Sequence, residues 1–162
     1  MAGKPEWLRV KLPEPQKYQH ILKHLAGQPT VCQNARCPNI GECFGRGIAT
    51  IMILGDICTR NCGFCAVKHG SPRPLDSREP QRVAQAVKAL GLRYAVITSV
   101  TRDDLEDGGA SGFALVINEV RRYNPHCLIE VLIPDFDGSE EALAKVIAER
   151  PGVINHNLES VP

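Results

Sequence analysis

Aromatic side chains are scarce in this sequence of 162 residues, where Trp, Tyr and Phe together make up only 5%. Neither sign of charge is in excess, because the chain has 19 Lys and Arg residues and 18 Asp and Glu residues, which gives a net charge of +1. Proteins that bind nucleic acid usually present a basic surface, often with aromatic side chains on which bases stack. The composition therefore predicts no nucleic-acid partner.

Long apolar runs are missing as well. No run comes near the ~20 residues that a membrane-spanning helix requires. The opening residues, Met1 to Glu6, do not have the pattern of a secretory signal peptide. We therefore expect a cytoplasmic protein that is not attached to a membrane. Hydrophobic residues make up 43% of the chain, which is enough to bury the core of one domain of ordinary size.

Cysteine, by contrast, is abundant, with seven residues of which six form two tight groups. One group has the spacing C-x3-C-x2-C and consists of Cys58, Cys62 and Cys65. The other has the spacing C-x4-C-x5-C and consists of Cys32, Cys37 and Cys43. An odd number of thiols without a secretory signal is a poor match to a disulfide framework. Because thiolate is the ligand that iron–sulfur clusters select, the two groups predict metal centres.

The C-x3-C-x2-C group offers only three local thiols. A cluster of four irons bound by three cysteines leaves one iron open to a substrate or cofactor. The alternative is a zinc site or a reactive thiol group, although structural zinc usually takes four ligands in paired CxxC spacing. The second group contains Asn, Pro and Gly between its thiols, residues that allow sharp turns. Zinc with a ligand from elsewhere in the chain is the alternative there.

Secondary-structure signals follow an alternating order. We expect strands at residues 49–54, 94–98, 127–133 and 153–157, and helices at 16–25 and 80–90 and around Phe113–Val120 and Leu143–Ile147. This order predicts βαβ units and a parallel sheet. The polar segments follow the strands, where the active sites of (β/α) barrels lie. The predicted fold is α/β, a partial (β/α) barrel that stops after about four strands. Residues 1–48 form an N-terminal extension bearing the second cysteine group, and residues 49–162 form the barrel part.

Several stretches of the chain are similar to one known family. The run Gly47–Cys62, the upstream C-x4-C-x5-C group and the run Ser99–Leu105 resemble lipoyl synthases, which are radical S-adenosylmethionine (SAM) enzymes. Lys4–Arg9 and Asn155–Glu159 are also similar to that family. The resemblance implies a sulfurtransferase that inserts two sulfur atoms into a protein-bound octanoyl chain, as a step of lipoate biosynthesis. The implied cofactors are two [4Fe-4S] clusters and SAM.

The resemblance also implies roles for the cysteines and for partner proteins. Cys58, Cys62 and Cys65 would bind the cluster that reduces SAM, and Cys32, Cys37 and Cys43 an auxiliary cluster that is consumed as the sulfur source. The octanoyl group would arrive on a lipoyl carrier domain or a glycine-cleavage H protein, and electrons from a ferredoxin or flavodoxin. In the family a serine of a C-terminal Arg-Ser-Ser motif also binds the auxiliary cluster. Because no such motif precedes Pro162, we expect this chain to be the N-terminal part of a longer protein.

Further candidate residues lie near the ends of the expected strands. Phe64 would shield the cluster or flank the adenine of SAM, and Thr98 and Ser99 would receive its amino group. Asn155, Asn157 and Glu159 would share one strand face and bind the ribose or amino groups, although polar residues that complete a strand end explain them equally well.

Three interpretations stay open at this stage. Arg102, Asp103 and Asp104 fit a substrate contact or a surface ion pair. Glu130, inside an apolar strand, needs a polar surrounding or a cationic partner. The alternative function for the whole chain is a non-catalytic iron–sulfur, zinc-binding or electron-transfer module.

Overall fold

A computed structural model describes residues 15–25, 27–35, 37, 39–45, 48 and 50–158. The Lys4–Arg9 run and Glu159, both named above, lie outside these residues. Within the described ranges, no helix is both long and apolar enough to cross a membrane.

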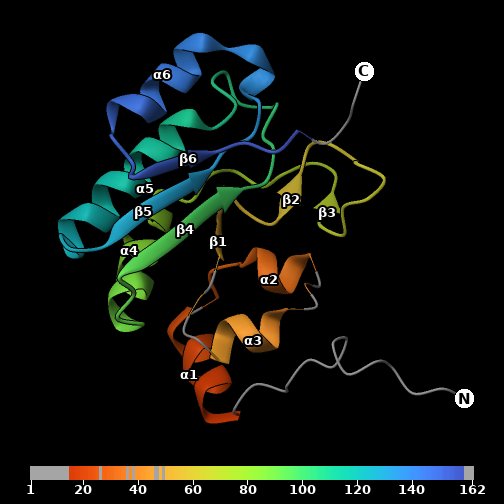
Figure 1. Cartoon of the computed structure of the whole chain (residues 1–162). Helices are drawn as coiled ribbons and strands as arrows, with labels where there is room; N and C mark the ends of the chain where they lie inside the picture. The colour runs from red at the N-terminus through yellow and green to blue at the C-terminus, as the bar shows by residue number, and fades with distance from the viewer. Residues whose placement is uncertain are drawn as a thin grey trace, which may run out of the picture.

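A parallel sheet of four strands forms the centre of the molecule (Figure 1). Its strands are β1 (Thr50–Ile53), β4 (Tyr94–Ser99), β5 (Leu128–Leu132) and β6 (Val153–Asn155), in the order β1-β4-β5-β6. Each neighbouring pair is parallel, with Ile51 opposite Ile97 and Ile97 opposite Val131. The order of the strands in the sheet is the order along the chain, as expected of one segment of a (β/α) barrel. The predicted α/β architecture is confirmed.

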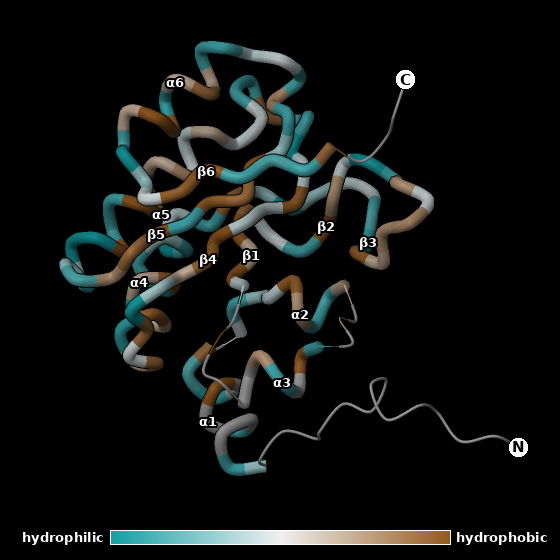
Figure 2. Tube along the Cα trace, in the orientation of Figure 1, coloured by the Kyte–Doolittle hydropathy of each residue, from teal (hydrophilic) through white to brown (hydrophobic). Residues whose placement is uncertain are grey.

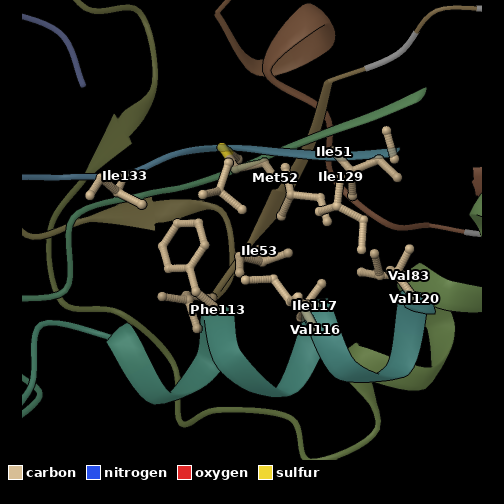
Figure 3. Packing of buried hydrophobic residues seen from close by; sticks show 14 of the residues in the cluster. Ile51, Met52, Ile53, Val83, Phe113, Val116, Ile117, Val120, Ile129 and Ile133 are labelled. Carbon is tan, nitrogen blue, oxygen red and sulfur yellow. The ribbon is translucent and has the colours of Figure 1, made fainter. Parts of the chain in front are cut away.

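Three helices connect these strands and cover one face of the sheet (Figure 1). They are α4 (Glu79–Ala89), α5 (Ala110–Tyr123) and α6 (Glu140–Ala148). Alternate strand residues point at the helices, and α5 directs its apolar stripe upward against them (Figure 3). The fully buried side chains of this layer are Ile51, Ile53, Ile97, Val131, Val83, Val87, Phe113, Val116, Ile117 and Val120. The helical spacing read from the sequence therefore identified the core face of α4 and α5.

The helix α6 is less buried than its sequence suggested. Ser139 caps it, since its side chain accepts a hydrogen bond from the backbone N–H of Ala142. Of its apolar residues Val146 is fully buried, but Leu143 and Ile147 are 36% and 51% exposed. Its main helical neighbour is α5, which itself packs between α4 and α6. A helix at the edge of a layer buries a narrower stripe than a helix between two neighbours.

The opposite face of the sheet carries Thr98, Glu130 and Asn155, which alternate along their strands with the residues that face the helices. Figure 2 shows β6 turning from hydrophobic to hydrophilic toward its carboxyl end. Glu130 lies on this face beside Val96 on β4 and Val153 on β6. Its carboxylate accepts hydrogen bonds from the Tyr94 hydroxyl and, at 2.6 Å, from the side-chain amide of Asn155. The expectation that Glu130 needs a polar surrounding is met by these two neutral donors.

The N-terminal helices lie beside β1 (Figure 1). They are α1 (Pro15–Leu25), α2 (Val31–Asn34) and α3 (Ile40–Gly45). α1 contacts α3 and α4, whereas α2 contacts β1. Ile21, Leu25 and Cys32 are buried in the same hydrophobic core as the sheet residues. The proposed boundary between residues 1–48 and 49–162 is thus crossed by core contacts and stays a prediction.

A second, small sheet was not expected from the sequence. It pairs β2 (Ile57–Cys58) in parallel with β3 (Lys68–His69), on either side of the segment that bears Cys62 and Cys65. Figure 1 shows it beside the carboxyl ends of β4 and β5. Two-residue strands have no periodic pattern that a sequence can reveal.

Candidate functional site

The chain leaves β1 through a left-handed turn that two buried charged side chains hold in place. Leu54 has a φ of 67°, and Gly55 follows with a φ of 98°. The backbone N–H of Leu54 donates to a Glu79 carboxylate oxygen at 2.8 Å, and its carbonyl accepts from Arg102 at 2.9 Å. Glu79 and Arg102 are 7% and 2% exposed. A residue other than Gly in this conformation costs of order 1–3 kcal/mol, so these contacts stabilise a strained turn.

The side chain of Leu54 is fixed as well. It is 3% exposed and packs on the N-terminus of α5. A Cβ atom at Gly109 or Gly112 would lie 2.3 or 2.4 Å from its terminal methyl groups. Two glycines are therefore needed for α5 to approach Leu54. The direction in which the chain enters the first cysteine group is set by this packing.

The first cysteine group lies on the loop between β2 and β3. Cys58 is half-buried at the end of β2, and Cys62 and Cys65 are exposed. The backbone N–H of Cys65 donates to the carbonyl of Cys62 at 3.0 Å, which forms a tight turn. The backbone N–H of Arg60 donates to the Cys58 sulfur at 3.4 Å.

Arg60 anchors this loop to the ends of two neighbouring strands. It donates to Asp103, which follows β4, at 2.9 and 2.8 Å. It also donates to Asp135, which follows β5, at 2.6 and 2.9 Å. The side chain of Thr59 adds a 2.9 Å hydrogen bond to Asp103. Hydrogen bonds from Arg60 hold the pKa values of both carboxyl groups below the ordinary value and raise the pKa of the guanidinium.

The second cysteine group lies on and between α2 and α3. Cys32 is 8% exposed on α2, and Cys37 and Cys43 are half-buried. Backbone hydrogen bonds connect the group, from the N–H of Cys37 to the carbonyl of Cys32 at 3.1 Å and from the N–H of Ile40 to the carbonyl of Cys37 at 3.3 Å. The first of these bonds brings the backbone of Cys37 next to that of Cys32.

The donor chemistry of both groups suits iron–sulfur clusters. All seven cysteines lie among the described residues and none is in a disulfide. Over the described part of the chain, no three Cys, His, Asp or Glu side chains are gathered tightly enough to bind one metal ion directly. Each group offers three thiols on one short segment, and thiolate is the ligand that iron–sulfur clusters select.

The other candidate residues lie at or beyond the strand ends. Thr98 is 6% exposed and donates to the carbonyl of Leu132 at 2.8 Å. The hydroxyl of Ser99 is buried without a hydrogen-bond partner in the described structure. Phe64 is 68% exposed beside the thiols, and Asn157 is exposed past the end of β6, which stops at Asn155. Contacts of these residues with SAM stay predictions.

Sequence reasoning missed three residues that organise this site. None of Glu79, Arg60 and Asp135 was among the candidate residues. Asp103 and Arg102 were expected in ion pairs or substrate contacts, and each does form an ion pair, with Arg60 and Asp104 respectively. A charged residue between the cysteines, with acidic residues after two other strands, is the signal that could have suggested the Arg60 contacts.

Comparisons with known proteins agree with this geometry. A family model described as the radical SAM superfamily matches residues 52–162. A lipoyl synthase of Desulfotalea psychrophila is 58% identical over 163 residues, which cover 99% of this chain and 54% of that protein. Lipoyl synthases of Caldanaerobacter subterraneus and Caldicellulosiruptor saccharolyticus are 56% and 54% identical, over 98% of this chain and 56% of each relative. The chain thus spans about half the length of the curated relatives it matches. Because the family model covers well over half of its residues, the chain belongs to the radical SAM superfamily.

Proposed function

We propose that this chain carries the radical SAM part of a lipoyl synthase, the sulfurtransferase that inserts two sulfur atoms into a protein-bound octanoyl chain. The supporting observation is the similarity to lipoyl synthases over 98–99% of the chain, a stretch that takes in both cysteine groups. The C-x3-C-x2-C loop at the carboxyl end of β1 supports the same proposal, because active sites of (β/α) barrels lie at that end.

Membership of the superfamily implies a [4Fe-4S] cluster and SAM. Cys58, Cys62 and Cys65 would bind that cluster and leave one iron without a protein ligand. The cluster and SAM together supply a 5′-deoxyadenosyl radical, which can take a hydrogen atom from an unactivated C–H bond. The contribution of the chain itself is to fix the loop through Leu54, Thr59 and Arg60.

The second cysteine group would bind the auxiliary cluster that supplies sulfur. Its ligands in this chain would be Cys32, Cys37 and Cys43. Because α2 contacts β1, and the first cysteine loop follows that strand, the extension is attached to the strand that leads into the SAM site. Attachment of both groups of thiols to the same strand suits a reaction that needs both a radical and a sulfur donor.

The remaining partners follow from the same proposal. Thr98, Ser99, Asn155, Asn157 and Glu159 would contact SAM, and Phe64 would cover the cluster or the adenine. The octanoyl substrate would be presented by a lipoyl carrier domain or H protein, and a ferredoxin or flavodoxin would deliver electrons. We place the reaction in the cytoplasm, because unpaired thiols persist in a reducing compartment.

Anaerobic reconstitution with iron and sulfide tests this proposal. We expect two clusters per chain by Mössbauer spectroscopy, an electron paramagnetic resonance (EPR) signal that changes when SAM is added, and 5′-deoxyadenosine after reduction. A protein that binds zinc in place of iron, or an iron–sulfur protein whose EPR signal ignores SAM, would support the electron-transfer or zinc-binding alternative and overturn the proposal.

A further inference from the structure

We propose that Arg60 is a positioning residue, which through Asp103 and Asp135 sets the placement of the three thiols relative to the strand ends. The inference rests on the proposed function, because it assigns the purpose of the contacts to cluster binding. Arg60 lies in the C-x3-C-x2-C sequence itself, between Cys58 and Cys62. Its two carboxylate partners come from segments 43 and 75 residues further along the chain.

The geometry requires an arginine. The Arg60 guanidinium donates four hydrogen bonds of 2.6–2.9 Å, two to the carboxylate of Asp103 and two to that of Asp135. The planar guanidinium has five donors in a fixed fork and can satisfy two carboxylates at once. A lysine ammonium is a point charge on a flexible stem and cannot reproduce both pairs of contacts.

The contacts act on the part of the loop that bears the thiols. Its two ends are already tied, since the N–H of Thr59 donates to the carbonyl of Thr101 at 3.0 Å and the N–H of Gly70 donates to the carbonyl of Cys58 at 2.9 Å. Those bonds fix where the loop leaves β2 and where the chain returns beside it after β3. The Arg60 contacts fix the segment between Cys58 and Cys62. The position of the Cys62 thiol therefore depends on the residues that follow β4 and β5.

The energetic role is local. The side chain of Arg60 is 34% exposed, and those of Asp103 and Asp135 are 40% and 46% exposed. Ion pairs at such exposure add little to the free energy of unfolding. Loss of the network should therefore loosen the loop while the fold stays intact. This separates Arg60 from Arg102, which is buried, donates to the carbonyl of Leu54 in the turn after β1 and supports the fold itself.

Hydrogen–deuterium exchange on the metal-free, reduced chain tests the positioning directly. We expect Arg60→Ala to speed exchange of the amides at 59–67 about fivefold or more, as expected when local opening loses a charge-assisted network. Asp103→Asn and Asp135→Asn should each give part of this effect, and Arg60→Lys should not restore protection. Arg122→Ala, which removes the surface pair with Glu119, is the matched control and should leave the loop unchanged.

A second measurement uses the reconstituted protein. We expect Arg60→Ala to retain iron but to lose most of the EPR change on addition of SAM, which the Arg122→Ala control should keep. Unchanged exchange at 59–67, together with a normal SAM response, would overturn the positioning role even if the unmodified chain forms its clusters. Failure of the unmodified chain to bind iron would instead overturn the proposed function, and the exchange comparison would still decide whether Arg60 orders the loop. Should Arg60→Ala fail to fold, Asp103→Asn provides the same comparison.

Discussion

The carboxylate of Glu79 accepts a 2.8 Å hydrogen bond from the backbone N–H of Leu54, the first residue after β1 on the way to the cysteine loop. Glu79 comes from the first turn of α4, 25 residues later in the chain. Its other oxygen accepts a 3.4 Å hydrogen bond from Gln28, which also donates to the carbonyl of Met52. One buried carboxylate therefore connects the N-terminal extension, β1 and α4 around a strained turn.

Removal of that carboxylate should destabilise the fold. Glu79→Ala leaves the buried N–H of Leu54 without an acceptor, which costs about 1–3 kcal/mol, whereas Glu79→Gln keeps an acceptor oxygen and should cost less. Urea unfolding monitored by circular dichroism measures both. Glu119→Gln, which alters only the ion pair with Arg122 on α5, is the control and should change the free energy of unfolding by under about 0.5 kcal/mol. Equal stability of Glu79→Ala and the control would show that Glu79 does not support the turn.

Gly109 should be intolerant of any side chain. Its φ is 94°, and an added Cβ would lie 2.3 Å from a methyl group of the buried Leu54. Gly109→Ala combines backbone strain with overpacking, each of order 1–3 kcal/mol. Gly63→Ala is a suitable control, because its Cβ would have no atom within 4 Å. Thermal unfolding of the two variants should differ clearly, and similar midpoints would contradict the close packing of Leu54 on α5.

The carboxyl group of Asp103 should titrate in stronger acid than an ordinary aspartate. Hydrogen bonds from Arg60 and then Thr59 lower its pKa from 3.8, while desolvation and the charge of Asp135 act in the opposite direction. Because the folded-state pKa lies below the unfolded one, the contribution to stability is present above about pH 3.8 and is lost as the pH falls through the folded value. Carbon-13 NMR of the side-chain carboxyl follows this titration. In Arg60→Ala the midpoint should rise toward 3.8, and an unchanged midpoint would argue against the pairing.

The pKa of the Tyr94 phenol should depend on the charge of Glu130. Its hydrogen bond to the Glu130 carboxylate raises the Tyr94 pKa above 10.0. Glu130→Gln removes the negative charge, so the Tyr94 pKa should move back toward 10.0. Carbon-13 NMR of labelled tyrosine measures the shift. Glu119→Gln, in which Tyr94 keeps its partner, should leave the titration unchanged.

The sequence predicted the strands and core faces better than the site. Ile51, Ile97 and Val131 lie in apolar runs, which are a local property of the sequence, so the strands and their parallel arrangement could be inferred. Arg60 and Asp135 meet only because parallel strands bring their carboxyl ends to one edge, and no local pattern states which polar residues pair there. Glu130 shows the same limit, since a polar partner was expected but its identity as Tyr94 and Asn155 depends on register.

Substitutions in the two cysteine groups should affect different steps of the reaction. By the proposed roles, Cys62→Ala should abolish the formation of 5′-deoxyadenosine, because the cluster that reduces SAM loses a ligand from the exposed loop. Cys37→Ala should spare that cleavage but stop sulfur transfer to an octanoylated carrier peptide. Cys127→Ala is the control, since Cys127 is a half-buried residue just before β5 and belongs to neither group. Liquid chromatography with mass spectrometry measures both products in one assay. If both variants cleaved SAM as well as the control does, the assignment of the C-x3-C-x2-C group to the SAM cluster would be wrong, because three thiols that leave one iron open cannot lose a ligand without effect on that chemistry.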